Sequence, residues 1–347
     1  MNEKVYFTKE DFLKEVKEIE ARTNRDDMPI RSVKFGENVS EFPFDDGAGF
    51  TIKVNINGEK AYIPCRGYAV RTLCQRLGIE GPVLDRMNGK ELTEILKKCA
   101  KKFRPEEQMK VVELDGTVLA VLSSGYKVIP ADEIYRMAED EVSKLGSKYL
   151  EGFVTDDIFS ATYQITNPEI RRAYDGFGEL SGDAIPMVRI TTSNTGFSSV
   201  SVVPMFRLRG RDIIIGRSLN ACHKGNSDEK TIEENLAQIF PLFKEAAEGL
   251  ERLQKVVIEF PEKCILNVAD RVHLPRKYVK LAAEELEHMI SWNQSVTAYD
   301  IYFALTEVMF HAQNAGAPKT ALDNLREQVA RVLFVDFKKY DVPYSKF

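Results

Sequence analysis

The sequence lacks the patterns that identify several common classes of protein. Its five cysteines are scattered, and no two have the C-x₂-C spacing of a zinc ribbon or a thioredoxin-type redox motif. No apolar run approaches the roughly 18 residues of a transmembrane helix. The N-terminus has no apolar segment before a small-residue cleavage site, so no signal peptide is expected. These absences favour a cytoplasmic protein with reduced thiols and no membrane partner.

Recognisable catalytic motifs are also missing. There is no G-x-x-x-x-G-K-[ST] phosphate loop and no G-x-S-x-G nucleophile turn. Gly176-x-Gly178 is followed by Ser181, where a dinucleotide-binding loop requires glycine. We therefore assign no catalytic residue and no cofactor, which favours a protein that is not an enzyme.

Two Glu–His pairs are the only candidates for a metal site. Glu285 and His288 have the Glu-x-x-His spacing of a carboxylate-bridged metal bundle, but Glu307 and His311 are four residues apart. Side chains three or four residues apart on a helix are ordinary surface neighbours. We therefore assign no metal ligand, and the metal site stays an open alternative.

The composition is that of a folded chain with a mildly acidic charge. The 347 residues are 44% hydrophobic, and 48 Lys and Arg face 53 Asp and Glu, for a net charge of −5. This length predicts two or three domains. The net charge argues against a polycation that coats nucleic acid indiscriminately.

Hydrophobic periodicity and turn signals predict an α+β fold. Mixed hairpins and helices fill the N-terminal half, a small antiparallel sheet packs on a long helix, and the C-terminal region is α-helical. We expect three regions: an N-terminal region with two hairpins, a β-β-β-α core and a helical region, at 1–150, 151–256 and 257–347. The expected elements are helices at 8–21, 67–77, 89–103, 131–145 and 228–254 (kinked at Pro241), hairpins around Asn57-Gly58 and Asp115-Gly116, a strand near Phe159 and strands at 186–192, 199–208 and 211–216.

One β-rich stretch departs from the average charge. Between Pro186 and Lys224 the only acid is Asp212, and the stretch has a local charge of +5. Guanidinium groups beside hydroxyls on a strand face suit phosphate oxygens. The alternative is a solvated strand face whose arginines pair with acids elsewhere in the chain. The candidate nucleic-acid-binding residues are Arg189, Arg207, Arg209, Arg211, Arg217 and Lys224.

Aromatic residues near this stretch offer two interpretations. They can stack on unpaired bases, or they can pack in the core and anchor loops. The residues concerned are Tyr163, Tyr174, Phe177 and Phe197.

Two segments carry a family resemblance. AVLSSGYKVIPADEI, at 120–134, and SNTGFSSVSVVPMFRLRGRDIIIG, at 193–216, resemble segments of the phage- and plasmid-associated family known as domain of unknown function 932. The helical end TAYDIYFALTEVMFHA is similar to that family's C-terminal helix. The resemblance implies a protein of a phage or another mobile element, acting in the cytoplasm of a bacterial host, with no assigned catalysis.

We therefore expect a protein that binds single-stranded nucleic acid, with DNA annealing or recombination as its setting. The order of three strands and a long helix is similar to the core of phage annealing proteins, which is an analogy of fold. Two alternatives remain: an interaction or assembly module, such as a homo-oligomer that modulates host processes, and an enzyme with an unrecognised site.

Overall fold

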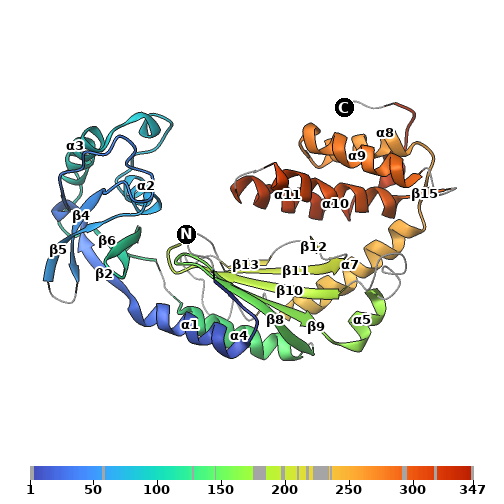
Figure 1. Ribbon diagram of the computed structural model, residues 1–347, viewed down its shortest axis with the longest axis horizontal. Helices are drawn as coiled ribbons and strands as arrows, with labels where there is room; N and C mark the ends of the chain where they lie inside the picture. Colours follow the sequence, from blue (N-terminus) through green and yellow to red (C-terminus); the bar gives the residue numbers. More distant parts are fainter. Residues whose placement is uncertain are drawn as a thin grey trace.

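The protein has the predicted α+β fold, in two parts. A computed structural model describes residues 4–56, 59–126, 129–144, 146–174, 185–196, 200–208, 211–215, 219–221, 234, 237–290, 295–315 and 319–344. Residues 23–126 form a small lobe, and the remaining described residues form a main body (Figure 1). The expected antiparallel sheet lies at the centre of the main body, and the helical C-terminal region lies beside it.

The main-body sheet has seven strands and is larger than the predicted three-stranded core, and the strand predicted near Phe159 is part of it. Its strand order is β1-β8-β9-β10-β11-β12, and β13 also pairs with β11. Every pairing is antiparallel. The strands are β1 (Lys4–Tyr6), β8 (Ser147–Val154), β9 (Phe159–Ile165), β10 (Ile185–Thr192), β11 (Val200–Leu208), β12 (Arg211–Ile214) and β13 (Leu219–Ala221).

Helices cover one side of this sheet. Phe12 packs edge-on against Tyr135, with ring centroids 4.9 Å apart, and Tyr174 bridges Phe206 of the sheet and Phe243. Alternation along β11 buries Val202 and Phe206 on this side. The four helices are α1 (Lys9–Arg22), α4 (Ala131–Lys144), α5 (Pro168–Tyr174) and α7 (Ile239–Gln254).

The C-terminal region extends the same hydrophobic core. Leu305 and Val308 pack with Leu250 of α7, which joins the helices to the sheet. No helix in the described residues is long and apolar enough to cross a membrane. The elements are β14 (Val257–Ile258), α8 (Pro261–Arg271), α9 (Arg276–Ile290), β15 (Val296–Thr297), α10 (Ala298–Asn314), α11 (Lys319–Val332) and the 3-10 turn η4 (Phe337–Lys339).

The small lobe has a second core between two three-stranded sheets and two helices. Asp115 and Gly116 both have positive φ, as the predicted two-residue hairpin turn requires. Asn88 and Glu91 form a capping box at the start of α3. The elements are β2 (Thr23–Pro29), η1 (Ile30–Ser32), β3 (Lys34–Phe35), β4 (Thr51–Ile56), β5 (Glu59–Pro64), α2 (Gly67–Arg76), η2 (Leu84–Arg86), α3 (Gly89–Ala100), β6 (Gln108–Leu114) and β7 (Thr117–Ser123).

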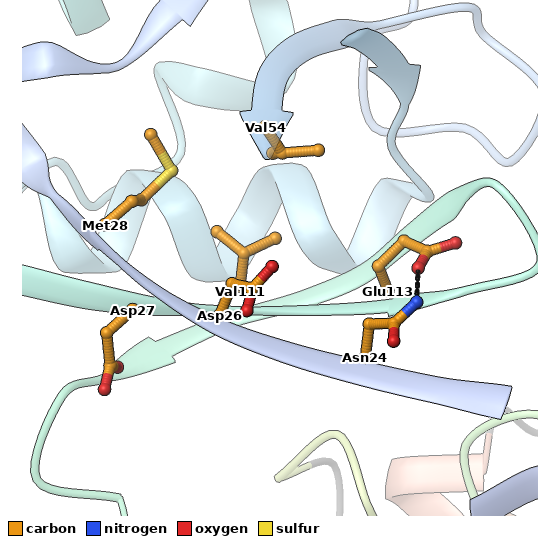
Figure 2. Close-up of a pocket in the computed structure, with 7 residues that line it drawn as sticks. All are labelled: Asn24, Asp26, Asp27, Met28, Val54, Val111 and Glu113. Atoms are coloured by element: carbon orange, nitrogen blue, oxygen red, sulfur yellow. Dashed lines mark hydrogen bonds between the residues drawn. The ribbon is translucent and has the colours of Figure 1, made fainter. Parts of the chain in front are cut away.

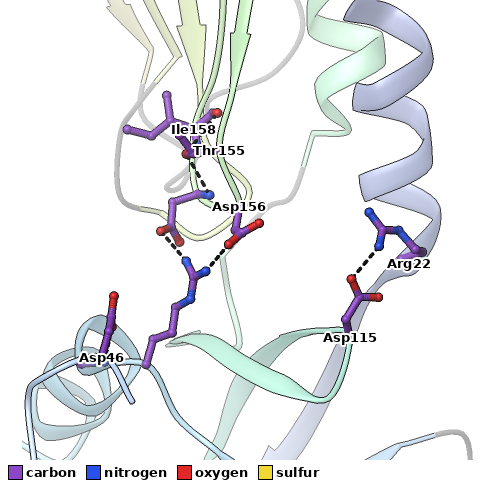
Figure 3. Close-up of polar contacts among 9 residues, drawn as sticks. Arg22, Asp46, Asp115, Thr155, Asp156 and Ile158 are labelled. Atoms are coloured by element: carbon purple, nitrogen blue, oxygen red, sulfur yellow. Dashed lines mark hydrogen bonds and ion pairs between the residues drawn. The ribbon is translucent and has the colours of Figure 1, made fainter. Parts of the chain in front are cut away.

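Ion pairs join the small lobe to the main body (Figure 3). Arg66, just before α2, contacts Asp156 and Asp157 in the turn between β8 and β9, with 3.0 Å to Asp157. Arg22 at the end of α1 contacts Asp115 at 2.5 Å. Burial raises the pKa of Asp157, and the charge of Arg66 opposes that shift.

Two expectations differ from the structure. The helix expected at 228–254 is interrupted: Glu234 and Ala237 are helical, Gln238 is a turn residue, and α7 begins at Ile239, with Pro241 in its first turn. Residues 228–233, 235 and 236 of the expected helix lie outside the described residues. The hydrophobic cores also divide the chain differently from the expected regions, because β1 and α1 pack with the main-body sheet. The boundaries at 150 and 256 stay predictions.

Candidate nucleic-acid interface

The polar side of the main-body sheet contains two of the six predicted arginine and lysine residues. Val188 and Ile190 of β10 point into the core, so Arg189 between them points to the opposite side. Arg207 reaches this side from β11, where its neighbour Phe206 is buried in the core. The alternation that buries one side of the sheet therefore brings these two arginines together on the other.

Both guanidinium groups are paired with carboxylates. Arg189 Nη2 donates to Asp212 Oδ2 at 2.6 Å, and its Nε donates to the Thr162 hydroxyl at 3.1 Å. Arg207 Nε donates to Asp212 Oδ1 at 2.7 Å, and its Nη2 donates to Glu151 Oε1 at 2.8 Å. These five residues, which we call the arginine network, connect strands β8, β9, β10, β11 and β12. One carboxylate thus lies between two guanidinium groups.

The network is half-buried, and its hydrogen bonds and ion pairs keep Arg207 and Asp212 charged. The side chains of Arg189, Arg207 and Asp212 are 24%, 26% and 23% exposed. Burial alone would raise the pKa of Asp212, but hydrogen bonds and charge from Arg207 and Arg189 outweigh burial and lower it. Hydrogen bonding to Asp212 raises the pKa of Arg207 further, against the effect of burial. Asp212 is therefore ionised at neutral pH.

The other predicted nucleic-acid-binding residues are only partly described. Arg211 pairs with Leu208 in the β11–β12 ladder, but its side chain lies outside the described part of the structure. Arg209, Arg217 and Lys224 lie outside the described residues altogether. The described structure thus brings Arg189 and Arg207 together and leaves the remaining four residues as predictions.

Two of the four candidate aromatic residues belong to the core. Tyr163 and Tyr174 are 3% and 0% exposed, and the Tyr174 hydroxyl donates to the Phe243 carbonyl at 3.0 Å. Neither ring is available to stack on a base in this conformation. Phe177 and Phe197 lie outside the described residues.

The Glu–His pairs meet in an unexpected combination. His311 Nε2 of α10 lies 3.1 Å from Glu285 Oε1 of α9, so residues from the two different pairs contact each other. Glu307 is buried, and the side chain of His288 is outside the described structure. Among the described residues, no three His, Cys, Asp or Glu side chains cluster closely enough to hold a metal ion.

A pocket in the small lobe is lined in part by acidic residues (Figure 2). It lies between β2, β4 and β6, and Asp26, Asp27 and Glu113 are among its lining residues. Glu113 accepts a hydrogen bond from Asn24 at 2.7 Å and another from the backbone N–H of Gly116, and Asp27 pairs with Lys110 at 3.2 Å. Glu113 and Asp27 therefore already take part in structural contacts.

Glu151, like Thr162, is a network residue that the sequence does not indicate. It lies 56 positions before Arg207, on a strand whose sequence SKYLEGFV has no clean alternation. The sequence does indicate Asp212, which is the one acid of the basic stretch. Because the predicted strands end at 208 and begin again at 211, a two-residue turn between them would pair residue 212 with Arg207, and the structure has this pairing. Only the pairing of β8 with β9 brings Glu151 near the arginines.

The fold and the site together define an α+β protein with an arginine–carboxylate network on the polar side of its larger antiparallel sheet. Comparison of the chain with protein-family models, curated proteins and solved structures finds no match.

Proposed function

We propose that the protein binds single-stranded nucleic acid through the polar side of its main-body sheet. The observation that supports this proposal is the convergence of Arg189 and Arg207 on one carboxylate, that of Asp212. A phosphate group presents the same negative charge and similar acceptor oxygens to a pair of guanidinium groups. The two arginines thus already have the arrangement that a phosphate ligand needs.

The proposed binding is an exchange of one anion for another. A backbone phosphate displaces Asp212 from at least one arginine, and the displaced carboxylate regains solvent. Exchange preserves the charge-assisted hydrogen bonds of the arginines, so it avoids leaving either guanidinium buried and unpaired. Because the contacts are to phosphates, the proposed affinity depends on salt and carries little sequence preference.

The proposed setting follows from the family resemblance. We propose a protein of a phage or another mobile element that acts on single strands in the cytoplasm of a bacterial host, in annealing or recombination. A homo-oligomer fits this setting, because the sheets of several copies could then bind along one nucleic-acid strand.

The test replaces both arginines of the network. The double variant Arg189→Gln/Arg207→Gln is compared with the wild type by fluorescence anisotropy, using a labelled single-stranded oligonucleotide at several salt concentrations. Loss of two phosphate contacts predicts a fall of about 1.4 in the slope of log affinity against log salt, and more than tenfold weaker binding at low salt.

A matched control separates the site from the overall charge. Arg136 on α4 is exposed, and its ion pair in the described residues is with Glu133 at 3.5 Å on the same helix, so Arg136→Gln changes the charge away from the sheet. It should leave binding within about twofold of the wild type. Unchanged binding in the double variant, or no binding by the wild type at low salt, would reject the proposal.

A further inference from the structure

The small lobe has a sheet surface whose charges are arranged differently. Strands β3, β4 and β5 form an antiparallel sheet, and Phe35, Ile52 and Ile63 point inward to the small-lobe core. The register places Lys34 beside Lys53, and Lys53 beside Tyr62, on the outward side.

Lys60 lies two residues before Tyr62 on β5 and therefore points to the same side. We call the four residues Lys34, Lys53, Lys60 and Tyr62 the lysine–tyrosine face. The face combines three positive charges with one aromatic ring.

This face is open to solvent. Tyr62 is 51% exposed, and Lys34 and Lys60 are exposed. Lys53 Nζ lies over the Tyr62 ring, 5.4 Å from its centroid, so a base that stacks on that face of the ring displaces the ammonium, and the opposite face does not require this. Among the side chains that the structure describes, no carboxylate lies within ion-pair distance of these three lysines.

We infer that the lysine–tyrosine face binds unpaired nucleotides, with a base stacked on Tyr62 and the flanking phosphates on the lysines. An exposed tyrosine ring accepts any base by its face, and the lysines, spread across three strands, can follow a backbone on either side of it. A duplex has its bases already stacked and cannot offer a free base face to the ring. The ligand of this face is therefore single-stranded.

This inference shares its ligand class with the proposed function and rests on different residues. The lysine–tyrosine face lies on the small-lobe sheet, whereas the arginine network lies on the main-body sheet (Figure 1). Either site can be disproved without the other, because the variants of one site leave the residues of the other unchanged.

The first experiment measures affinity for a labelled oligo-dT by fluorescence anisotropy in Tyr62→Ala, Tyr62→Phe and Lys53→Glu. Loss of one stacked base predicts about tenfold weaker binding in Tyr62→Ala, while Tyr62→Phe, which keeps the ring, stays within about twofold of the wild type. Lys53→Glu should lower the slope of log affinity against log salt, the salt slope, by at least about 0.7, which is the value for one phosphate contact to a single strand.

The control is Lys17→Glu. Lys17 is an exposed lysine on α1 in the main body, so this variant has the same change of charge on another surface. It should keep the wild-type slope. A slope that falls equally in Lys17→Glu and Lys53→Glu would reject a specific site.

A second experiment uses the wild-type protein and does not depend on how a variant folds. An oligonucleotide containing 5-bromodeoxyuridine is photo-crosslinked to the protein, and the attached peptide is identified by mass spectrometry. Crosslinking at Tyr62, competed by unlabelled oligo-dT and not by duplex, is the expected result. Binding that Lys53→Glu weakens and Tyr62→Ala leaves intact, with equal competition by a poly-glutamate peptide, would show a general polyanion surface and overturn the inference.

The two proposals can be distinguished in one titration series. If Tyr62→Ala weakens binding and Arg189→Gln/Arg207→Gln does not, the lysine–tyrosine face stands and the arginine network is not the site. The reverse result retains the arginine network and rejects the lysine–tyrosine face.

Discussion

The main-body sheet and the β3-β4-β5 sheet of the small lobe, called the small-lobe sheet below, present their basic residues in opposite ways. On the main-body sheet, Arg189 and Arg207 are half-buried and tied to Asp212 and Glu151. On the small-lobe sheet, Lys34, Lys53 and Lys60 stand beside an exposed tyrosine, and no described carboxylate pairs with them. The comparison teaches that a local excess of positive charge does not by itself make a surface available to a ligand.

The arginines are paired and, among the described residues, the lysines are not, because different strands lie on either side of them. In the main-body sheet, β8 and β12 flank the arginines and each contributes one acid to them. In the small-lobe sheet, the described outward neighbours of Lys53 are Lys34 and Tyr62. A half-buried arginine needs such a carboxylate, whereas an exposed lysine is hydrated and does not.

The largest expected effect is on stability, at the acid between the two arginines. Asp212→Ala leaves Arg189 and Arg207 half-buried with one partner fewer, so we expect a loss of about 2 kcal/mol in the free energy of unfolding. Urea unfolding followed by circular dichroism measures it. A loss below about 0.5 kcal/mol would mean that the network is as weak as an exposed ion pair.

The next largest effect is on binding. Asp212→Asn keeps the shape of the side chain and removes the negative charge that competes with phosphate, so affinity for a single strand should rise about fivefold at low salt. Fluorescence anisotropy measures this change, and Asp85→Asn is the control, because the ion pair described for Asp85 is with the exposed Arg71 in the small lobe. Weaker binding in Asp212→Asn would contradict competition between Asp212 and phosphate.

A smaller effect follows from pH. Arg207 and Arg189, acting against burial, hold the pKa of Asp212 below its ordinary value in the folded state. The contribution of ionised Asp212 to the free energy of unfolding is therefore fully present above the unfolded pKa of about 3.9. It is lost as the pH falls through the lower pKa of the folded state. Unfolding free energies of the wild type and Asp212→Asn should converge below about pH 4. A difference that stays constant down to pH 2 would exclude this titration.

The smallest effect is expected on the small-lobe sheet. Lys34→Ala removes an exposed side chain and Lys53→Ala a partly exposed one, and neither has a described ion pair, so each should change the free energy of unfolding by about 0.5 kcal/mol or less. The same urea titration tests both. A loss above about 1 kcal/mol would show that these lysines stabilise the fold, as the arginine network does.

Local signals in the sequence predicted much of the fold. The Asp115-Gly116 turn predicted a hairpin, and the sequence at 89–103 predicted a helix; the structure contains both. Apolar alternation likewise predicted β11 and the side of it that is buried. These features depend on residues close together in the chain, which is why a sequence read without a structure can identify them.

Pairing between distant segments could not be predicted in the same way. β1 and β8 lie at opposite ends of the first 154 residues, and β2 is formed by the polar segment TNRDDMP, which has no strand pattern. Without the pairing of β8, the sequence cannot show that Glu151 is the second carboxylate partner of Arg207. The sequence therefore identified the arginines as candidates and could not show how their charges are balanced.

Binding of a single strand by the wild-type protein is the direct test of the proposed function. The measurement is fluorescence anisotropy with a single-stranded oligonucleotide and its duplex, each at about 50 and 200 mM salt. We expect binding that favours the single strand and weakens steeply between the two salt concentrations. No binding to the single strand at the lower salt, or equal affinity for the duplex, would contradict the proposed function.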